Sequence, residues 1–283
     1  TLNGISASNA AVGLGTLSGS ATIPVGIYSG HEVRARLVQT AAGKVWLCAA
    51  FHSAIGGIPQ DPARELACAP VGLDGKLGAK VTVEFTPMLA QFEVASAPTA
   101  PNELWLTYGG PVGLGSPGIA NFRFNPATGK VTASMSVHKA AGVKVCATIV
   151  QAESTGSLFT DGAGGELVMG VNSGYAAMAP YKVSPDGVGK GGCDVVELGG
   201  GAILVVYAAP NVDGSGWGIV GRMGDAVNTQ GYGKPWVINS QTVGDQVDPS
   251  VVRLTNGDYV VSYRDGAGTA YTVIGHVHSP EIY

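Results

Sequence analysis

Charged residues are scarce in this sequence. They make up 13% of the 283 residues, about half of the ~25% found in an average globular protein. Apolar residues reach 45%, which excludes a disordered chain, because disorder combines low apolarity with high charge. The 16 Lys and Arg residues are scattered, and the net charge is −4. Because a clustered basic patch is missing, the sequence predicts no nucleic-acid partner.

Long apolar runs, helix patterns and metal-binding cysteine pairs are also missing. No run approaches the ~20 apolar residues of a membrane span, so no membrane insertion is predicted. No window combines a 3.6-residue apolar period with capping residues. The four cysteines form no CxxC pair, so the sequence predicts no zinc site.

Glycine and short β-type runs are abundant instead. The 44 Gly residues, together with Pro, Asn and Asp, separate short apolar or alternating segments, which is typical of an all-β fold. The segments recur in units of roughly 50–57 residues, close to the ~40–50 residues of a four-stranded propeller blade. The first strands of five such units are expected to begin near Val33, Ala90, Val143, Asp194 and Pro249.

This spacing predicts a five-bladed β-propeller over residues 31–283. Residues 1–30 are expected to form an N-terminal arm, in which 21–29 supplies the missing outer strand of the fifth blade and so closes the ring. The third unit is irregular, because the segment between Val183 and Cys193 has room for a turn but hardly for a strand. Tandem β-sandwich domains are the alternative fold.

The cysteines are expected to form at most one disulfide. Cys48 and Cys68 fall on adjacent strands of the first unit, whereas Cys146 and Cys193 fall near the starts of first strands in neighbouring units. A disulfide needs Cα atoms ~4.4–6.8 Å apart. We therefore expect Cys48–Cys68 as the bridge, with four buried thiols as the alternative.

Residues 207–265 carry a further pattern. They contain DGSGWG at 213–218, GDQVDPSVVRL at 244–254 and NGDYVVSY at 256–263. The pattern resembles a β-propeller-like repeat of secreted and cell-surface bacterial proteins and of phage tail proteins. This resemblance implies a propeller architecture and an extracellular or virion location.

Loops on one face of the predicted propeller carry the residues expected to bind a ligand. Sugars are bound by stacking on aromatic rings and by planar hydrogen-bonding groups, and Trp217 beside a glycine-rich loop is the main candidate. Asp213 resembles a calcium-loop residue, yet its segment lacks the alternating acids and final Glu of an EF-hand. No cofactor is therefore predicted, with calcium as the alternative. The other expected ligand-binding residues are His52, Tyr108, Tyr175, Arg264 and Asp265.

An enzyme would need acidic residues around the central funnel. Five-bladed propellers include glycosidases with such acids on their innermost strands, and residues 247–252 look like the strand that carries the catalytic base in some of them. This similarity implies Asp248, Asp194 and Glu32 as the catalytic set. In the competing interpretation, Asp248 only caps a turn before Pro249.

The sequence favours recognition without catalysis. We expect a phage tail-fibre or spike component, or a secreted adhesin, that acts like a lectin on a host-surface glycan or binds other virion proteins. Low charge, abundant Gly and an all-β pattern suit such a compact extracellular module. Two alternatives stay open: a five-bladed glycoside hydrolase, and a purely structural virion protein.

Overall fold

A computed structural model describes most of the chain that follows residue 33. It covers residues 34–51, 54–55, 58–59, 65–84, 91–112, 116–139, 144–151, 154–160, 167–173, 176–177, 181–184, 192–199, 201–210, 216–225, 232–239 and 244–276. Strands and turns alone make up these segments, and none of them contains a helix long and apolar enough to cross a membrane. The predicted closing strand, 21–29, lies outside the described residues.

The first two sheets each contain four antiparallel strands. Sheet 1 has the order β1-β2-β5-β6, formed by β1 (Arg34–Gln39), β2 (Val45–Phe51), β5 (Glu65–Val71) and β6 (Val81–Thr82). A two-stranded ribbon, β3 (Ala54–Ile55) and β4 (Ile58–Pro59), lies in the connection from β2 to β5. Sheet 2 has the order β7-β8-β9-β10, formed by β7 (Gln91–Ser96), β8 (Leu104–Val112), β9 (Ser116–Phe124) and β10 (Val131–Lys139).

The remaining three sheets contain five, four and three strands. Sheet 3 consists of β11 (Lys144–Gln151), β12 (Ser154–Thr160), β13 (Leu167–Ser173), β14 (Ala176–Ala177) and β15 (Tyr181–Lys182), and both short strands pair with β13. Sheet 4 has the order β16-β17-β18-β19, formed by β16 (Cys193–Gly199), β17 (Ala202–Pro210), β18 (Trp217–Asp225) and β19 (Trp236–Val237). Sheet 5 has the order β20-β21-β22, formed by β20 (Gln246–Arg253), β21 (Tyr259–Asp265) and β22 (Ala270–Gly275).

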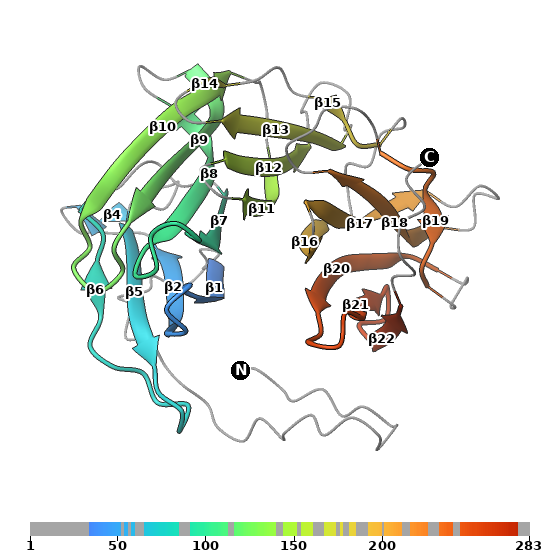
Figure 1. Cartoon of the computed structure of the whole chain (residues 1–283), viewed down its shortest axis with the longest axis horizontal. Helices are drawn as coiled ribbons and strands as arrows, with labels where there is room; N and C mark the ends of the chain where they lie inside the picture. The colour runs from blue at the N-terminus through green and yellow to red at the C-terminus, as the bar shows by residue number, and fades with distance from the viewer. Residues whose placement is uncertain are drawn as a thin grey trace.

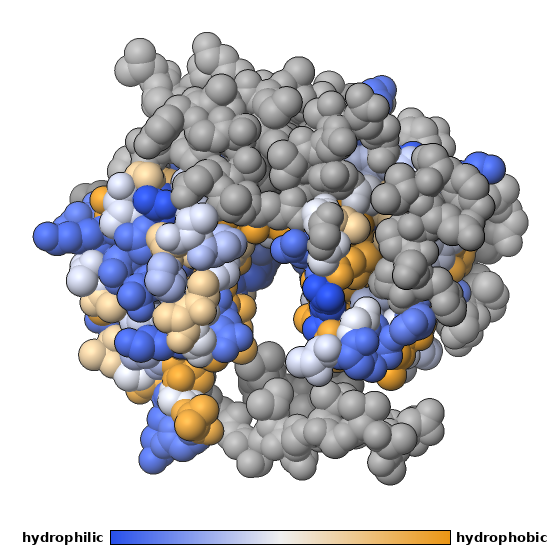
Figure 2. Space-filling model, viewed as in Figure 1, coloured by the Kyte–Doolittle hydropathy of each residue, from blue (hydrophilic) through white to orange (hydrophobic). Residues whose placement is uncertain are grey.

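The sheets form a propeller-like ring. Their first strands contact one another in the order β1, β7, β11, β16 and β20, and these strands lie innermost in Figure 1. Sheets 1 and 5 face each other across the remaining gap, and the space-filling view in Figure 2 shows an opening through the middle. Tandem β-sandwich domains do not describe this arrangement.

Apolar side chains between neighbouring sheets hold the ring together. One buried cluster joins sheets 1 and 2 around Leu66, Phe92 and Leu106, and a second joins sheets 3 and 4 around Ile149 and Val205. A third cluster joins sheets 4 and 5, and a smaller group joins sheets 2 and 3. Because a strand exposes alternate residues to opposite faces, each middle sheet packs on both neighbours, which explains the nearly continuous apolar run of β17.

The prediction of five complete blades is confirmed only in part. Four sheets have the four or more strands of a complete blade, whereas three strands are described for sheet 5. The expected starts of the first strands agree with β1, β7, β11, β16 and β20 within about three residues. In the third sheet, β12 is an additional strand that pairs with β11 and β13, and most of the segment between Val183 and Cys193 lies outside the described residues.

The expectation of at most one disulfide was also wrong, because the structure contains two. Cys48–Cys68 joins directly opposed residues of β2 and β5 with Cα atoms 4.1 Å apart. Cys146–Cys193 joins β11 to β16 with Cα atoms 5.4 Å apart. The second bridge forms because packing of sheet 3 on sheet 4 brings the starts of their inner strands together.

Candidate functional site at the centre of the ring

The inner strands carry charged side chains close to where they begin. Arg36, Glu93 and Asp248 are the third residues of β1, β7 and β20, and Asp194 is the second residue of β16. The third residue of β11 is Cys146. Contacts between neighbouring sheets, described below, bring these strand beginnings to one end of the central opening.

Arg36 and Glu93 join sheets 1 and 2. The guanidinium donates from Nε to Glu93 Oε2 over 2.6 Å and from Nη2 to Glu93 Oε1, and its Nη1 donates to the carbonyl of Ala35. Glu93 is buried and Arg36 is half-buried. The hydrogen bonds to Glu93 raise the pKa of Arg36. A bidentate pair of this kind holds both side chains in a fixed geometry, so both Glu93 oxygens are already engaged.

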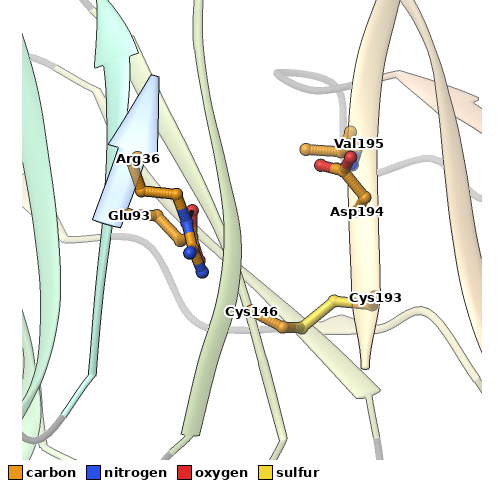
Figure 3. The surroundings of a disulfide bond; sticks show 6 residues. All are labelled: Arg36, Glu93, Cys146, Cys193, Asp194 and Val195. Atoms are coloured by element: carbon orange, nitrogen blue, oxygen red, sulfur yellow. Dashed lines mark hydrogen bonds and ion pairs between the residues drawn. A yellow bond between two sulfur atoms is a disulfide. The ribbon is translucent and has the colours of Figure 1, made fainter. Parts of the chain in front are cut away.

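Sheets 2 and 3 meet through hydroxyl groups, and sheets 3 and 4 through the second disulfide. Thr107 on β8 hydrogen-bonds Thr148 on β11 over 2.8 Å and also donates to Asn121 on β9. At the next junction, between sheets 3 and 4, the disulfide Cys146–Cys193 fixes β11 against β16. Figure 3 shows Arg36 and Glu93 on one side of the central space and Asp194 on the other, with the disulfide nearby.

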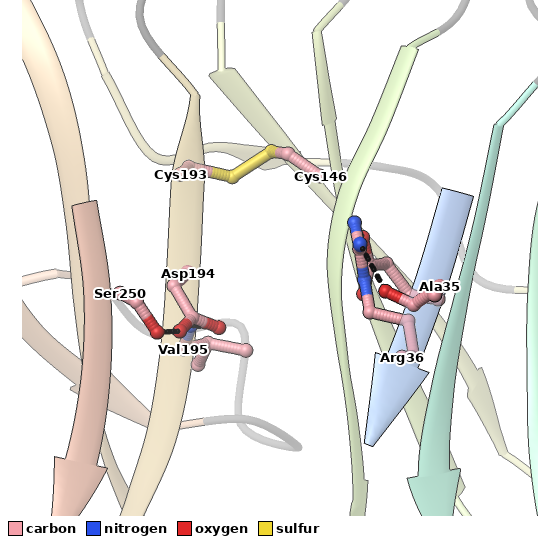
Figure 4. Close-up of polar contacts among 8 residues, drawn as sticks. Ala35, Arg36, Cys146, Cys193, Asp194, Val195 and Ser250 are labelled. Carbon is pink, nitrogen blue, oxygen red and sulfur yellow. Dashed lines mark hydrogen bonds and ion pairs between the residues drawn. A yellow bond between two sulfur atoms is a disulfide. The ribbon is translucent and has the colours of Figure 1, made fainter. Parts of the chain in front are cut away.

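Asp194 joins sheets 4 and 5. Its Oδ2 accepts hydrogen bonds from the Val251 amide at 2.8 Å and from Ser250 Oγ at 3.0 Å, and its Oδ1 accepts from the Val195 amide. Figure 4 shows the contact with Ser250. Burial raises the pKa of Asp194, although these three hydrogen bonds and the charge of Arg36 act in the opposite direction. A carboxyl group with a raised pKa holds a proton at higher pH than an ordinary Asp.

Asp248 precedes Ser250 by two residues on β20 and has an unusual backbone conformation. It has φ 52°, the one positive φ among the described non-glycine residues. The β20–β21 register shifts between Val247 and Ser250, which is the mark of a β-bulge, a device that redirects a side chain and often lies next to active sites. The exposed carboxylate of Asp248 pairs with Arg264 on β21. The backbone of Gly192, next to Cys193, lies against Asp248.

The structure divides the predicted catalytic set. Asp194 and Asp248 lie on β16 and β20, which contact each other at the junction of sheets 4 and 5, while Glu32 lies outside the described residues. Sequence reasoning missed Glu93 and Arg36, which flank the same opening. The sequence signal for Glu93 was a charged residue inside a short apolar strand, QFEVAS. Its partner Arg36 is 57 positions away, so local patterns could not identify the pair.

The predicted ligand-binding residues do not form one group. Tyr108 is only 5% exposed in the core of sheets 1 and 2, where it packs edge-on against Phe122, so its expected place at the ligand-binding surface was wrong. Burial raises its pKa. Trp217 is half-buried and packs against the cluster of sheets 4 and 5. The residues His52, Tyr175 and Asp213 lie outside the described part of the chain.

Arg264 and Asp265 lie together at the end of β21, and they act differently. Arg264 reaches Asp248 across the sheet, with about half of its side chain exposed. Asp265 shapes the turn to β22, because its carboxylate accepts from the amides of Ala267 and Thr269 and from Tyr271 Oη. The bond from the Thr269 amide is the main reason that the pKa of Asp265 is lowered. Among the described residues, no three His, Cys, Asp or Glu side chains are placed to hold a metal ion.

Known structures resemble this ring closely enough to establish its fold. A protein of unknown function from Dyadobacter fermentans matches with a TM-score of 0.61 at 11% identity, over 86% of this chain and 76% of its own. An α-L-arabinanase from Penicillium chrysogenum, solved with arabinobiose, matches with a TM-score of 0.57 at 12% identity, over 87% of this chain and 82% of its own. The chain has a β-propeller fold.

A third similar structure is larger. The Hadza microbial sialidase Hz136 matches with a TM-score of 0.55 at 10% identity, and the match covers 87% of this chain. This chain spans only about half of that sialidase, 52% of its length. No protein-family model and no curated sequence matches the chain. At such low identities, the similar structures establish the propeller fold alone.

Proposed function

We propose that this protein is a carbohydrate-active β-propeller of the glycoside hydrolase class, with its reaction centre where sheets 4 and 5 meet at the central opening. In this proposal, Asp194 protonates the leaving oxygen and Asp248 acts as the second carboxylate. Sheet 5 is the fifth blade of the ring.

The observation that carries the proposal is the contrast between these two neighbouring aspartates. Asp194 is half-buried with a raised pKa, whereas Asp248 is exposed and paired with Arg264. A glycosidase needs one carboxyl group that holds a proton and one that is ionised. Two carboxyl groups in such different environments are the usual basis for acid and base assignments.

The similar structures support the same class. Two of the three similar structures are named as an arabinanase and a sialidase, and they share the ring-shaped propeller fold with this chain. The two disulfides favour an oxidising compartment, because disulfides are rare in reducing cytosol. An extracellular protein that acts on surface or environmental glycans is consistent with both points.

The decisive experiment measures sugar release from a linear arabinan and from a sialylated glycoprotein. The wild-type chain is expected to release sugar from at least one of them. Asp248→Asn and Asp194→Asn should each lower the rate by about 100-fold or more, the range of general acid–base catalysis. The matched control is Asp74→Asn, which removes an exposed ion pair with Lys76 in sheet 1 and should leave the rate unchanged.

Recognition without catalysis is the second candidate, and one observation favours it. Both oxygens of Asp194 and both of Glu93 already accept hydrogen bonds from this chain, which suits a structural role. In that case, the protein is a glycan-binding module of a virion or cell surface. Retention of a glycan on immobilised wild-type protein, with no sugar released from any substrate, would reject the hydrolase in favour of this candidate.

A further inference from the structure

The two disulfides of this chain lie in different surroundings. Cys48 and Cys68 are 0% and 1% exposed within the apolar cluster of sheets 1 and 2. Cys193 is 7% exposed, whereas Cys146 is only partly buried and packs against the cluster that joins sheets 3 and 4. Disulfide exchange begins when a thiolate attacks one sulfur, so its rate depends on access to that sulfur. A dissolved thiol therefore reaches the second bridge, through Cys146, more easily than the first.

The two bridges also differ in what else holds their strands together. Cys48 and Cys68 are directly opposed in the β2–β5 ladder, in which every residue of β2 is paired. Strands β11 and β16 belong to different sheets, so no ladder of hydrogen bonds joins these two strands, and apolar packing around Ile149 and Val205 supports their junction. Reduction would leave β2 and β5 in register, but it would remove the cross-link between sheets 3 and 4.

The second bridge is linked along the chain to both aspartates of the proposed site. Cys193 follows Gly192, and a Cβ added to Gly192 would lie 3.5 Å from Asp248 Cα. Cys193 precedes Asp194, whose Oδ2 accepts a hydrogen bond from the Val251 amide over 2.8 Å. Figure 3 shows the bridge and the Asp194 side chain on the same strand. A displacement of Cys193 would therefore disturb the surroundings of both carboxylates.

We propose that the Cys146–Cys193 disulfide is a switch of this site that small-molecule thiols open. A thiolate of the reductant attacks Cys146 Sγ, which forms a mixed disulfide and releases the Cys193 thiolate. A second reductant thiolate attacks the reductant's sulfur in the mixed disulfide, which releases the Cys146 thiolate and forms the oxidised reductant. The two cysteine thiolates take up the two protons that the reductant thiols lost, so the bridge gains two electrons and two protons.

Opening the bridge frees the beginning of β16 from β11. The hydrogen bonds that Asp194 accepts from sheet 5 then lose the support of a fixed strand. Packing around Ile149 and Val205 keeps sheets 3 and 4 together, so the two thiols stay close and reoxidation restores the junction. The effect on a reaction rests on the proposed function, whereas the opening of the bridge and the loosening of the junction do not.

Alkylation of the full wild-type chain tests which bridge opens first. The protein is treated with increasing concentrations of reduced glutathione, its free thiols are alkylated, and peptide mass mapping identifies the modified residues. Cys146 and Cys193 should be modified at a thiol concentration about 10-fold lower than Cys48 and Cys68, because only the second bridge is accessible. Equal sensitivity of the two bridges, or earlier opening of Cys48–Cys68, would overturn the proposal.

Amide exchange then measures the effect on the site. When Cys146–Cys193 alone is reduced, the Val251 amide should exchange about 10-fold faster, because local opening of its contact with Asp194 becomes easier. Amides of β9, which is paired on both edges, should keep their rates. The variant Cys146→Ala, Cys193→Ala should show the fast Val251 rate with or without glutathione. An unchanged Val251 rate after reduction, or loss of protection throughout the chain, would overturn the proposal.

Sugar release links the switch to the proposed function. The rate, followed by chromatography of the released sugar, should fall about 10-fold on selective reduction and return after oxidation by oxidised glutathione, as expected for a reversible exchange. An active wild type that keeps its full rate after reduction would overturn the proposal. A wild type that releases no sugar in either state would reject the proposed function instead, and the alkylation and exchange results would still decide whether the switch exists.

Discussion

The two sides of the central opening are built differently. Between sheets 1 and 2, Arg36 and Glu93 satisfy each other, so opposite charges cancel in a bidentate pair. Between sheets 4 and 5, Asp194 is satisfied by amide and hydroxyl donors, and no cation is in contact with it among the described residues. Asp248 and Arg264 lie nearby with half of their side chains exposed.

This difference distinguishes the side of the opening at sheets 1 and 2, where the charged groups are paired, from the side at sheets 4 and 5, which carries the proposed site. The Arg36–Glu93 pair joins sheets 1 and 2, and because the two charges compensate each other and both Glu93 oxygens accept hydrogen bonds, it leaves few groups for binding a ligand. The opposite side combines a carboxyl group with a raised pKa, a second exposed carboxylate and a positive-φ residue. Strained backbone and shifted pKa values cluster at functional sites, so the asymmetry supports the proposed site at sheets 4 and 5.

The largest effect on stability is expected from the disulfide next to Asp194. Replacing Cys146 and Cys193 together by Ala removes a bridge between residues 47 positions apart, and loop entropy puts the loss at roughly 4 kcal/mol. The matched control replaces Cys48 and Cys68, which are 20 positions apart, and should cost roughly 3 kcal/mol. Urea unfolding measures both.

Functional assays should distinguish the two disulfide variants more clearly than measurements of stability do. Cys146–Cys193 fixes the strand that carries Asp194, whereas Cys48–Cys68 lies within sheet 1. Below the unfolding transition, only the first double variant should lose sugar release or glycan retention. Equal functional losses in both variants would contradict the assignment of the site to sheets 4 and 5.

The next largest effect is expected from Glu93→Gln. This change leaves the half-buried Arg36 guanidinium without its counter-charge, and breaking a buried ion pair on one side costs about 3 kcal/mol. The double variant Arg36→Met, Glu93→Leu removes both charges and should recover most of that loss, since an apolar pair of similar volume is often as stable. Urea unfolding at pH 7 decides the matter: equal stabilities of single and double variants would show that the charges are not coupled.

Much of the fold could be predicted from local patterns. The inner strands are short apolar runs bounded by turns, and their starts were placed within a few residues for that reason. Strand β12 was missed because its sequence, STGSLFT, has little apolar alternation; it is stabilised by pairing with β11 and β13 on both edges. Whether a segment like β12 forms a strand therefore depends on the strands that pair with it, and its own sequence does not show them.

The site was less predictable, since it is made by contacts between sheets. Asp194 and Asp248 were chosen as candidates because they lie near the starts of strands in a recognisable repeat. The sequence did not show that Asp194 binds the backbone of Val251, nor that Cys146 would reach Cys193. Each of these contacts depends on the angle between neighbouring sheets, which the packing of many apolar side chains sets.

Removing the Asp194 carboxylate should have an intermediate effect. Asp194→Ala leaves the Val251 amide without an acceptor at the junction of two sheets, and an unsatisfied buried donor costs about 2 kcal/mol. Asp194→Asn keeps an accepting oxygen and should lose less. Chemical unfolding of the two variants at pH 7 measures the difference, and a more stable Ala variant would contradict the role of this contact.

The pH dependence of the Asn variant sharpens this result. Burial raises the pKa of Asp194 in the folded chain above its unfolded value of about 4, so the folded chain binds this proton more tightly. The contribution of Asp194 to stability is therefore greatest at low pH and falls as pH rises from about 4 through the folded pKa. The stability of wild type relative to Asp194→Asn should fall from pH 4 to pH 7, and a rise over that interval would mean that its pKa is lowered.

The smallest effect concerns the backbone at Asp248, and it isolates strain from charge. Asp248→Gly and Asp248→Ala both remove the ion pair with Arg264, so their difference reports the positive φ of 52° alone. A left-handed conformation costs an L-residue such as Ala about 1 kcal/mol, and Gly adopts it freely. The Gly variant should therefore be the more stable by about 1 kcal/mol. At Arg253, an exposed residue of the same strand without a positive φ, the order should reverse, because Gly weakens a strand. If Ala were the more stable at both positions, the bulge would carry no strain, and the proposed site would rest on the raised pKa of Asp194 and the exposure of Asp248.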